Sequence, residues 1–175
     1  MAGITDSLVL ARSSTTFQHD IAALAVSPSG QHVAVALWTS QEVHLVDLAS
    51  SPLAPCATHR IDSTYLIRSL AFTAFSSLAD GTDTTLLAGL GDGTLVSLAV
   101  DVASGTFAAS SSKAVALGKR PLQLTEIAHG DDRAVFAASD RPTIISRSKD
   151  RLVYSSVNLA VRPRPLPLSP LPPAR

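Results

Sequence analysis

Five histidines are the first side chains to consider for catalysis or metal binding, because imidazole transfers protons near neutral pH and ligates zinc. They are His19, His32, His44, His59 and His129, and neither an HExxH nor a CxxC pattern accompanies them. A metal site would have to be assembled by folding alone, and the single cysteine, Cys56, excludes a cysteine-based zinc cage and an intramolecular disulfide. The sequence predicts no metal, no cofactor and a structural thiol.

Two other patterns could carry chemistry. The segment Gly89-Leu-Gly91-Asp-Gly93 is glycine-rich, but it fits neither GxGxxG nor GxxxxGK[ST], and an apolar, strand-like run follows it. We therefore expect a hairpin turn there. Asp131 and Asp132 could act as paired carboxylates, yet no partnering acid stands at a motif spacing, so a solvated turn is favoured. With no GxSxG nucleophile motif either, the sequence predicts a protein that is not an enzyme and has no small-molecule substrate.

Three residues are candidates for contacts with a partner. Trp38, the only tryptophan, ends an apolar run and is either an exposed recognition anchor or, as we favour, part of the packing at a sheet edge. Asp140 and Arg141 lie between two strand-like runs. They could pair across a turn, which is the favoured interpretation, or face a partner.

The C-terminal tail offers a second candidate contact. Arg164, Pro167 and Pro170 fit a basic-x-apolar-Pro-x-x-Pro pattern. In a polyproline II helix the two prolines would present one edge to an aromatic groove, while the arginine meets its acidic rim. Chance matches are common in proline-rich tails, so the alternative that this pattern binds no partner stays open.

Short apolar or alternating runs bounded by turn residues recur between residues 20 and 160, which indicates an all-β fold. We expect strands at residues 21–26, 33–38, 42–48, 57–61, 67–72, 85–90, 94–100, 113–117, 122–127, 134–138, 143–146 and 152–155. Aligning the middle strands pairs Ala36 with Ala88 and Ala138, a period near 50 residues. Four strands per repeat of this length is typical of a β-propeller blade. Because propellers close with about four to eight blades, three blades leave two open faces to be covered by another chain or by self-association.

Composition supports one folded domain. The chain has 175 residues, of which 46% are hydrophobic and 16% are charged, and no apolar run reaches the length of a membrane span. We expect a flexible N-terminal segment at 1–18 without a targeting signal, a partial propeller at 19–160 and a disordered Pro/Arg-rich tail at 161–175. Six of the eleven prolines lie in that tail.

The net charge of zero hides an asymmetry. Residues 1–112 carry three basic and nine acidic side chains, a net charge of −6, whereas residues 113–175 carry eleven basic and five acidic ones, a net charge of +6. A basic half can bind nucleic acid or an acidic partner. Nucleic-acid binding through the C-terminal half is therefore the alternative to a protein-binding role.

Several blocks of sequence resemble one protein family. The blocks are residues 35–39 (VALWT), 87–95 (LAGLGDGTL), 117–121 (LGKRP), 135–145 (VFAASDRPTII) and 152–159 (LVYSSVNL). They are similar to the family of the large subunit of the damage-specific DNA-binding protein, which it shares with the large subunits of cleavage-and-polyadenylation and splicing factors. The resemblance covers residues 19–159 and points to about three later blades of that family's second propeller.

This resemblance implies a non-enzymatic scaffold for protein interaction, part of the adaptor of a cullin-type ubiquitin ligase that acts in DNA repair. The implied partners are a cullin or other subunits that dock on propellers, with any DNA contact indirect. The implied location is the nucleus, with the cytoplasm as the alternative. Because the family pattern continues past residues 157–159 whereas this sequence becomes Arg/Pro-rich, the resemblance also implies a truncated form.

Overall fold

A computed structural model describes residues 14–75, 83–108, 112–129, 132–148 and 151–158. In these ranges the regular secondary structure consists of β-strands. The described residues contain no helix that is long and apolar enough to span a membrane. The strands are β1 (Ile21–Val26), β2 (His32–Leu37), β3 (Glu42–Asp47), β4 (Pro55–Arg60), β5 (Ile67–Phe75), β6 (Asp83–Leu90), β7 (Thr94–Asp101), β8 (Thr106–Phe107), β9 (Lys113–Ala116), β10 (Gln123–His129), β11 (Asp132–Ala138), β12 (Thr143–Ser148) and β13 (Arg151–Ser156). The all-β prediction is confirmed.

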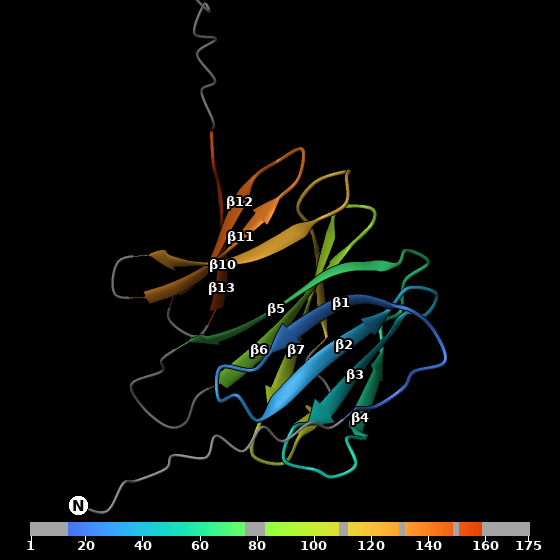
Figure 1. Cartoon of the computed structure of the whole chain (residues 1–175). Coiled ribbons are helices and arrows are strands. Elements are labelled where there is room, and N and C mark those ends of the chain that lie inside the picture. Colours follow the sequence, from blue (N-terminus) through green and yellow to red (C-terminus); the bar gives the residue numbers. More distant parts are fainter. Residues whose placement is uncertain (1–13, 76–82, 109–111, 130–131, 149–150, 159–175) are drawn as a thin grey trace, which may run out of the picture.

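The strands form three antiparallel sheets, each built from strands in sequence order (Figure 1). We call them blade 1 (β1–β4), blade 2 (β5–β9) and blade 3 (β10–β13). Blade 2 differs from the predicted four strands because β7 pairs with β8 at one end, through Val100 and Phe107, and with β9 at the other, through Leu95 and Val115. An incomplete propeller of three blades is therefore confirmed, with an extra short strand in the middle blade.

The fourth strand of blade 1 begins earlier than predicted. Its first residue is Pro55, which pairs with Val46 beside a register shift. A proline is tolerated here because β4 is the edge strand of its sheet, where the missing N–H group interrupts no further ladder.

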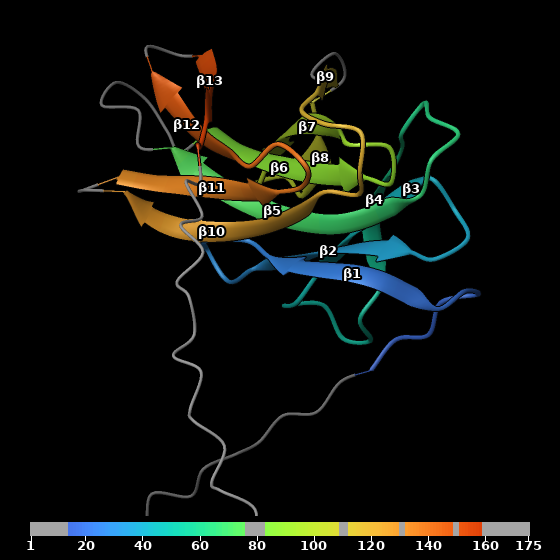
Figure 2. The same cartoon turned by 90° about the horizontal axis from the view of Figure 1, so that it is seen from above.

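The blades pack face to face around their first strands, with β1 against β5 and β5 against β10 and β11 (Figure 2). Alternation along each strand produces this packing, because successive side chains point to opposite faces. On β2, for example, Ala34 and Ala36 join the core between blades 1 and 2, whereas Val33, Val35 and Leu37 face the other side. Each blade thus has a face toward its neighbour.

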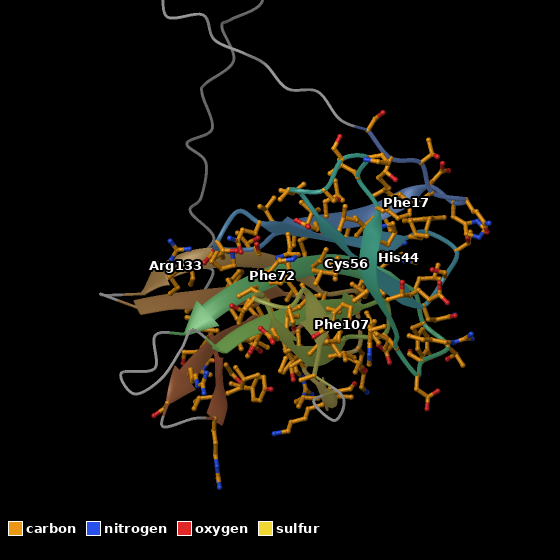
Figure 3. The ribbon with its side chains drawn as sticks, turned by 90° about the horizontal axis from the view of Figure 1, so that it is seen from below. Phe17, His44, Cys56, Phe72, Phe107 and Arg133 are labelled. Atoms are coloured by element: carbon orange, nitrogen blue, oxygen red, sulfur yellow. The ribbon has the colours of Figure 1, made fainter. Side chains whose placement is uncertain are left out.

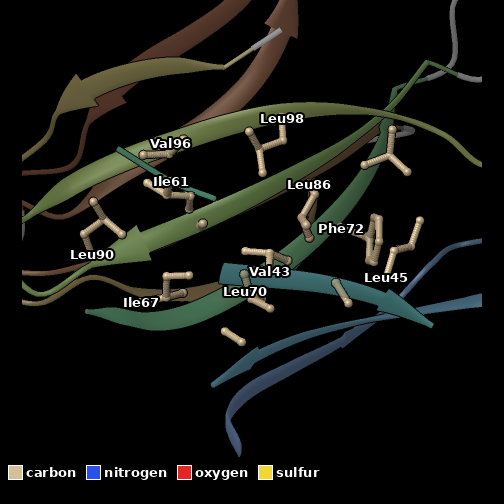
Figure 4. Close-up of a cluster of buried hydrophobic side chains, with 14 residues drawn as sticks. Val43, Leu45, Ile61, Ile67, Leu70, Phe72, Leu86, Leu90, Val96 and Leu98 are labelled. Carbon is tan, nitrogen blue, oxygen red and sulfur yellow. The ribbon is translucent and has the colours of Figure 1, made fainter. Parts of the chain in front are cut away.

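Two apolar clusters hold the three sheets together. The larger lies between blades 1 and 2 (Figure 4) and consists of Ala34, Ala36, Val43, Leu45, Ile61, Ile67, Leu70, Phe72, Leu86, Ala88, Leu90, Val96, Leu98 and Val100. The second lies between blades 2 and 3 and consists of Ala71, Leu87, Leu95, Leu122, Leu124, Val135, Ala137 and Ile145. Blade 2 is therefore covered on both faces, and blades 1 and 3 each keep one outer face.

Hydrogen bonds stabilise two turns, one at residues 27–30 and one at the predicted hairpin turn of the glycine-rich segment. In the first, the Gly30 N–H group donates to the Ser27 carbonyl at 2.9 Å, and Gly30 has a φ of +70°. In the second, Asp92 accepts hydrogen bonds from the N–H and hydroxyl groups of Thr94 at 2.9 and 2.8 Å. The carboxylate of the glycine-rich segment is thus used to stabilise its own hairpin, as expected of a turn.

Candidate protein-interaction surfaces

Five of the connections between strands lie at the same end of the blades. We call this end the connection rim, and it consists of residues 38–41, 61–66, 91–93, 117–122 and 139–142. Hydrogen bonds join neighbouring connections along it. Ile61 N–H donates to the Gln41 carbonyl at 2.8 Å, Gly91 N–H to the Leu66 carbonyl at 3.1 Å and Gly118 N–H to the Gly93 carbonyl at 3.3 Å. The rim is therefore a continuous surface across all three blades.

Trp38 lies on this rim at the end of β2. Its side chain is 46% exposed, and its backbone N–H group donates to the Asp20 carbonyl at 2.7 Å. The Cζ atom of Arg68 lies 4.6 Å from the centre of its ring, a cation–π contact that holds the ring in place. Tyr65, on the next connection, is also half exposed. A fixed, exposed aromatic ring has the properties of an interface anchor.

Asp140 and Arg141 lie on the same rim, but they do not pair with each other. The Asp140 carboxylate accepts hydrogen bonds from the Lys119 N–H group at 2.9 Å and from the Ser139 hydroxyl at 3.0 Å. Asp140 thereby ties the β11–β12 turn of blade 3 to the link that leaves blade 2. Arg141 donates its backbone N–H to the Ser139 hydroxyl at 3.2 Å, and its exposed side chain forms no ion pair with any described residue.

The Asp140 contact predicts a pH effect. The hydrogen bond from the Lys119 N–H group, followed by that from Ser139, holds the pKa of Asp140 below its ordinary value of 3.8. Its contribution to stability is therefore complete above pH 3.8 and is lost as the pH falls through the lower folded pKa. An NMR titration of the Asp140 carboxyl carbon should give a midpoint below 3.8 in the wild type. In the Ser139→Ala variant the midpoint should rise, and an unchanged midpoint would contradict this assignment.

Sequence reasoning missed Ser69, a buried residue of β5. Its hydroxyl donates to the Leu122 carbonyl at 2.7 Å and accepts from the Leu124 N–H group at 3.2 Å, so one side chain joins blade 2 to the first strand of blade 3. Gly89 lies beside it, and a Cβ there would be 2.6 Å from the Ser69 oxygen. The only sequence signal was a serine within a predicted strand.

Replacing Ser69 with alanine should lower the free energy of unfolding by about 1–3 kcal/mol, because a buried carbonyl and a buried N–H group lose their partner. Ser97→Ala is the matched control, since this buried serine of the same blade has one longer hydrogen bond, 3.3 Å to the Lys113 carbonyl. Urea denaturation of both variants measures the difference. Equal losses would show that the Ser69 contact does not couple the blades.

The outer face of blade 1 holds a cavity of about 420 Å³ between residues 16–19 and the sheet. Phe17 and Leu53 pack on Val35, Leu37 and Val46 of this face, and the Phe17 ring lies 5.5 Å from that of His44 (Figure 3). The cavity is also lined by the charged side chains of Glu42 and Arg60. In the described part of the chain, no three His, Cys, Asp or Glu side chains are grouped to hold a metal ion.

Cys56 lies on the exposed edge strand of blade 1, and its thiol contacts the Leu45 carbonyl at 3.2 Å. Partial burial raises the pKa of this thiol above its ordinary value of 9.0, so it stays protonated at neutral pH. The remaining predicted contacts, Arg164, Pro167 and Pro170, lie outside the described residues, as does Asp131.

Comparison of the sequence with protein families finds a match over most of the chain. The RSE1/DDB1/CPSF1 second beta-propeller family matches residues 5–163. The chain is 32% identical to DNA damage-binding protein 1 of Solanum lycopersicum over 147 residues, which are 81% of this chain and 13% of that protein. It is also 32% identical to DNA damage-binding protein 1 of Drosophila melanogaster over 162 residues, 89% of this chain and 13% of the relative. The chain thus spans about an eighth of the length of these relatives.

Comparison of the structure finds propellers at low sequence identity. The fission yeast SREBP-SCAP binding domains superpose with a TM-score of 0.59 at 11% identity, over 82% of this chain and 38% of that structure. The WD40 domain of SCAP from fission yeast gives a TM-score of 0.52 at 10% identity, over 79% of this chain and 32% of the other. These likenesses concern the fold alone and agree with a propeller that is only partly present. The family match over residues 5–163 and the 32% identity to these relatives show that this chain belongs to the RSE1/DDB1/CPSF1 second β-propeller family.

Proposed function

We propose that this chain is a non-enzymatic scaffold segment that binds other proteins through its connection rim. The observation that carries the proposal is the rim itself, where an exposed, fixed tryptophan and exposed charged side chains from different blades share one surface. Aromatic and arginine side chains are enriched at protein interfaces and among the residues that dominate binding.

Membership of the family supports an inference about the partner. Relatives are named DNA damage-binding proteins, and we infer a role in the same process, as part of a nuclear adaptor that recruits a cullin-type ubiquitin ligase in DNA repair. Because the chain spans 13% of those relatives, the cullin and the nuclear location are inferences for this chain. The rim would supply the docking surface, and any DNA contact would be made by other subunits.

The test is retention of a purified cullin on the immobilised chain. We expect the wild type to retain the cullin and Trp38→Ala to weaken binding by about 30-fold, the effect of losing an interface anchor worth about 2 kcal/mol. Leu48→Ala is the control, because this residue is 42% exposed and follows β3 at the opposite end of blade 1. Absence of retention by the wild type, or equal binding by the two variants, would contradict the proposal.

A second candidate function rests on charge at the same rim. Lys119, Arg120 and Arg141 form no ion pair with any described residue, and Asp92 and Asp140 accept hydrogen bonds from neighbouring groups of the rim. Three free cations could neutralise phosphates of a nucleic acid. Duplex DNA bound by three such contacts should lose about 40-fold in affinity between 50 and 200 mM salt. Affinity independent of salt, measured by fluorescence anisotropy, would exclude this role.

A further inference from the structure

The cavity on the outer face of blade 1 has the size of a small-molecule site. Its volume of about 420 Å³ lies near the lower end of the range of about 300–1,000 Å³ that ligand sites occupy. All its lining residues lie between Thr16 and Arg60, and the labelled side chains of Phe17 and His44 come from its two walls (Figure 3). Blade 1 and the segment just before it therefore build the cavity together.

A buried nitrogen in this cavity lacks a hydrogen-bond partner. The Nδ1 atom of His44 lies 3.0 Å from the Thr58 hydroxyl oxygen, whereas the buried Nε2 atom forms no hydrogen bond with any described residue. The Oε2 atom of Glu42 lies 3.7 Å from Nε2, which is too long for a hydrogen bond. Because an unpaired buried polar atom costs free energy, Nε2 indicates a polar group that these residues do not supply.

The two atoms together fit an ammonium group. In the tautomer in which Nδ1–H donates to Thr58, the Nε2 atom of His44 is an acceptor, as is the Glu42 carboxylate. An ammonium group has three N–H donors, and one such group can contact two acceptors that lie 3.7 Å apart. Hydrogen bonds between an ammonium and a carboxylate are among the stronger ones in proteins. The place between Glu42 and His44 thus suits a primary amine.

An arginine supplies the opposite charge in the same cavity. Arg60 of β4 lies directly across the ladder from Glu42 of β3, and both side chains line the cavity. Even so, no ion pair joins them, and Arg60 forms none with any other described residue. A guanidinium group binds a carboxylate through two parallel hydrogen bonds. A site for a cation and a site for a carboxylate therefore lie side by side.

The third feature of the cavity is apolar. Phe17 and Leu37 line it, and the Phe17 ring lies 5.5 Å from the His44 ring. Phe17 is held in place because it packs on the cluster of Val35, Leu37 and Val46. An apolar group of a ligand would find an aromatic and an aliphatic surface beside the charged pair.

We propose that this cavity binds a free amino acid with a large apolar side chain, such as phenylalanine. The ammonium group would lie between Glu42 and His44, the carboxylate on Arg60, and the apolar side chain against Phe17 and Leu37. A simple amine or a simple carboxylate would match only one of the two charges, whereas an amino acid matches both. The ligand would be bound unchanged, in keeping with a non-enzymatic chain.

NMR titration of the isotope-labelled chain tests the proposal with three related compounds. We expect phenylalanine to shift the amide signals of residues 16–19 and 37–44 saturably. Phenethylamine, which lacks the carboxylate, and phenylpropionate, which lacks the ammonium group, should each bind at least about 10-fold more weakly, because each loses a charge-assisted contact. No saturable shift with phenylalanine up to about 10 mM, or equal binding of the three compounds, would overturn the proposal.

Two charge variants test which residue holds which group. Arg60→Gln should weaken phenylalanine and phenylpropionate about 10-fold but not phenethylamine, and Glu42→Gln should weaken phenylalanine and phenethylamine but not phenylpropionate. Arg133→Gln is the control, because this exposed arginine of blade 3 pairs with Glu126 far from the cavity residues in sequence. Glu42 and Arg60 are not buried, so both variants should unfold like the wild type in circular dichroism. Equal weakening of all three compounds by either variant would contradict the assignment.

Discussion

Replacing Leu86 with alanine should lower the free energy of unfolding by about 2–5 kcal/mol, the range for removing a buried leucine side chain from a packed core. Leu86 is fully buried on β6 and belongs to the cluster that joins blades 1 and 2 (Figure 4). The cavity left behind would face side chains from both sheets, which limits how far the site can collapse. Because a domain of this size has about 5–15 kcal/mol of stability in total, this single change should remove a large share of it.

Chemical denaturation followed by circular dichroism measures the loss. Leu48→Ala is the matched control, because it removes the same atoms from an exposed leucine and should change the stability by less than about 0.5 kcal/mol. If Leu86→Ala unfolded at the same denaturant concentration as the control, the inter-blade core would not be the main source of stability.

Replacing Gly93 with alanine should cost about 2–5 kcal/mol, because two separate effects add. Gly93 has a φ of +90°, which L-residues with a Cβ adopt at a cost of about 1–2 kcal/mol. A Cβ there would also lie 2.5 Å from the carbonyl carbon of Gly118 and 2.8 Å from the Lys119 nitrogen, and such overpacking costs about 1–3 kcal/mol. Neither neighbour is the flexible end of a side chain, so the connection between blades 2 and 3 would have to move.

Gly30→Ala separates the two effects. Gly30 also has a positive φ, +70°, but no atom lies within 4 Å of a Cβ built on it. This variant should therefore lose only the conformational part, about 1–2 kcal/mol. The difference between the two variants measures how tightly the rim is packed, and equal losses would contradict the close contact between residues 93 and 118.

Much of the fold could be predicted because each strand carries its own signal. The run at residues 94–100 is apolar at five of its seven positions, as expected of a strand covered on both faces. Turn residues such as Gly30 and Asp92 mark where the chain reverses. The repeat near 50 residues then predicts that every four strands form one blade. Strand β8 and the start of β4 at Pro55 were not predicted, because both depend on edge pairing and not on a local pattern.

The site was less predictable because its contacts join residues far apart in sequence. Trp38, Asp140 and Arg141 follow the second strand of their blades, so the repeat alone places them at one end. The contact of Arg68 with Trp38 and that of Asp140 with Lys119 link separate connections, and no local pattern indicates them. The same holds for Ser69, whose partners lie 53 and 55 residues away.

Hydrogen exchange of the backbone amides tests the central claim most directly, namely that the three sheets form one propeller segment that carries a common rim. We expect the middle strands β2, β6 and β11 to exchange with one shared opening free energy, equal to that of global unfolding, because the two inter-blade clusters join them into one cooperative unit. Separate opening free energies for the three blades would contradict the account, since the rim would then be a set of independent turns.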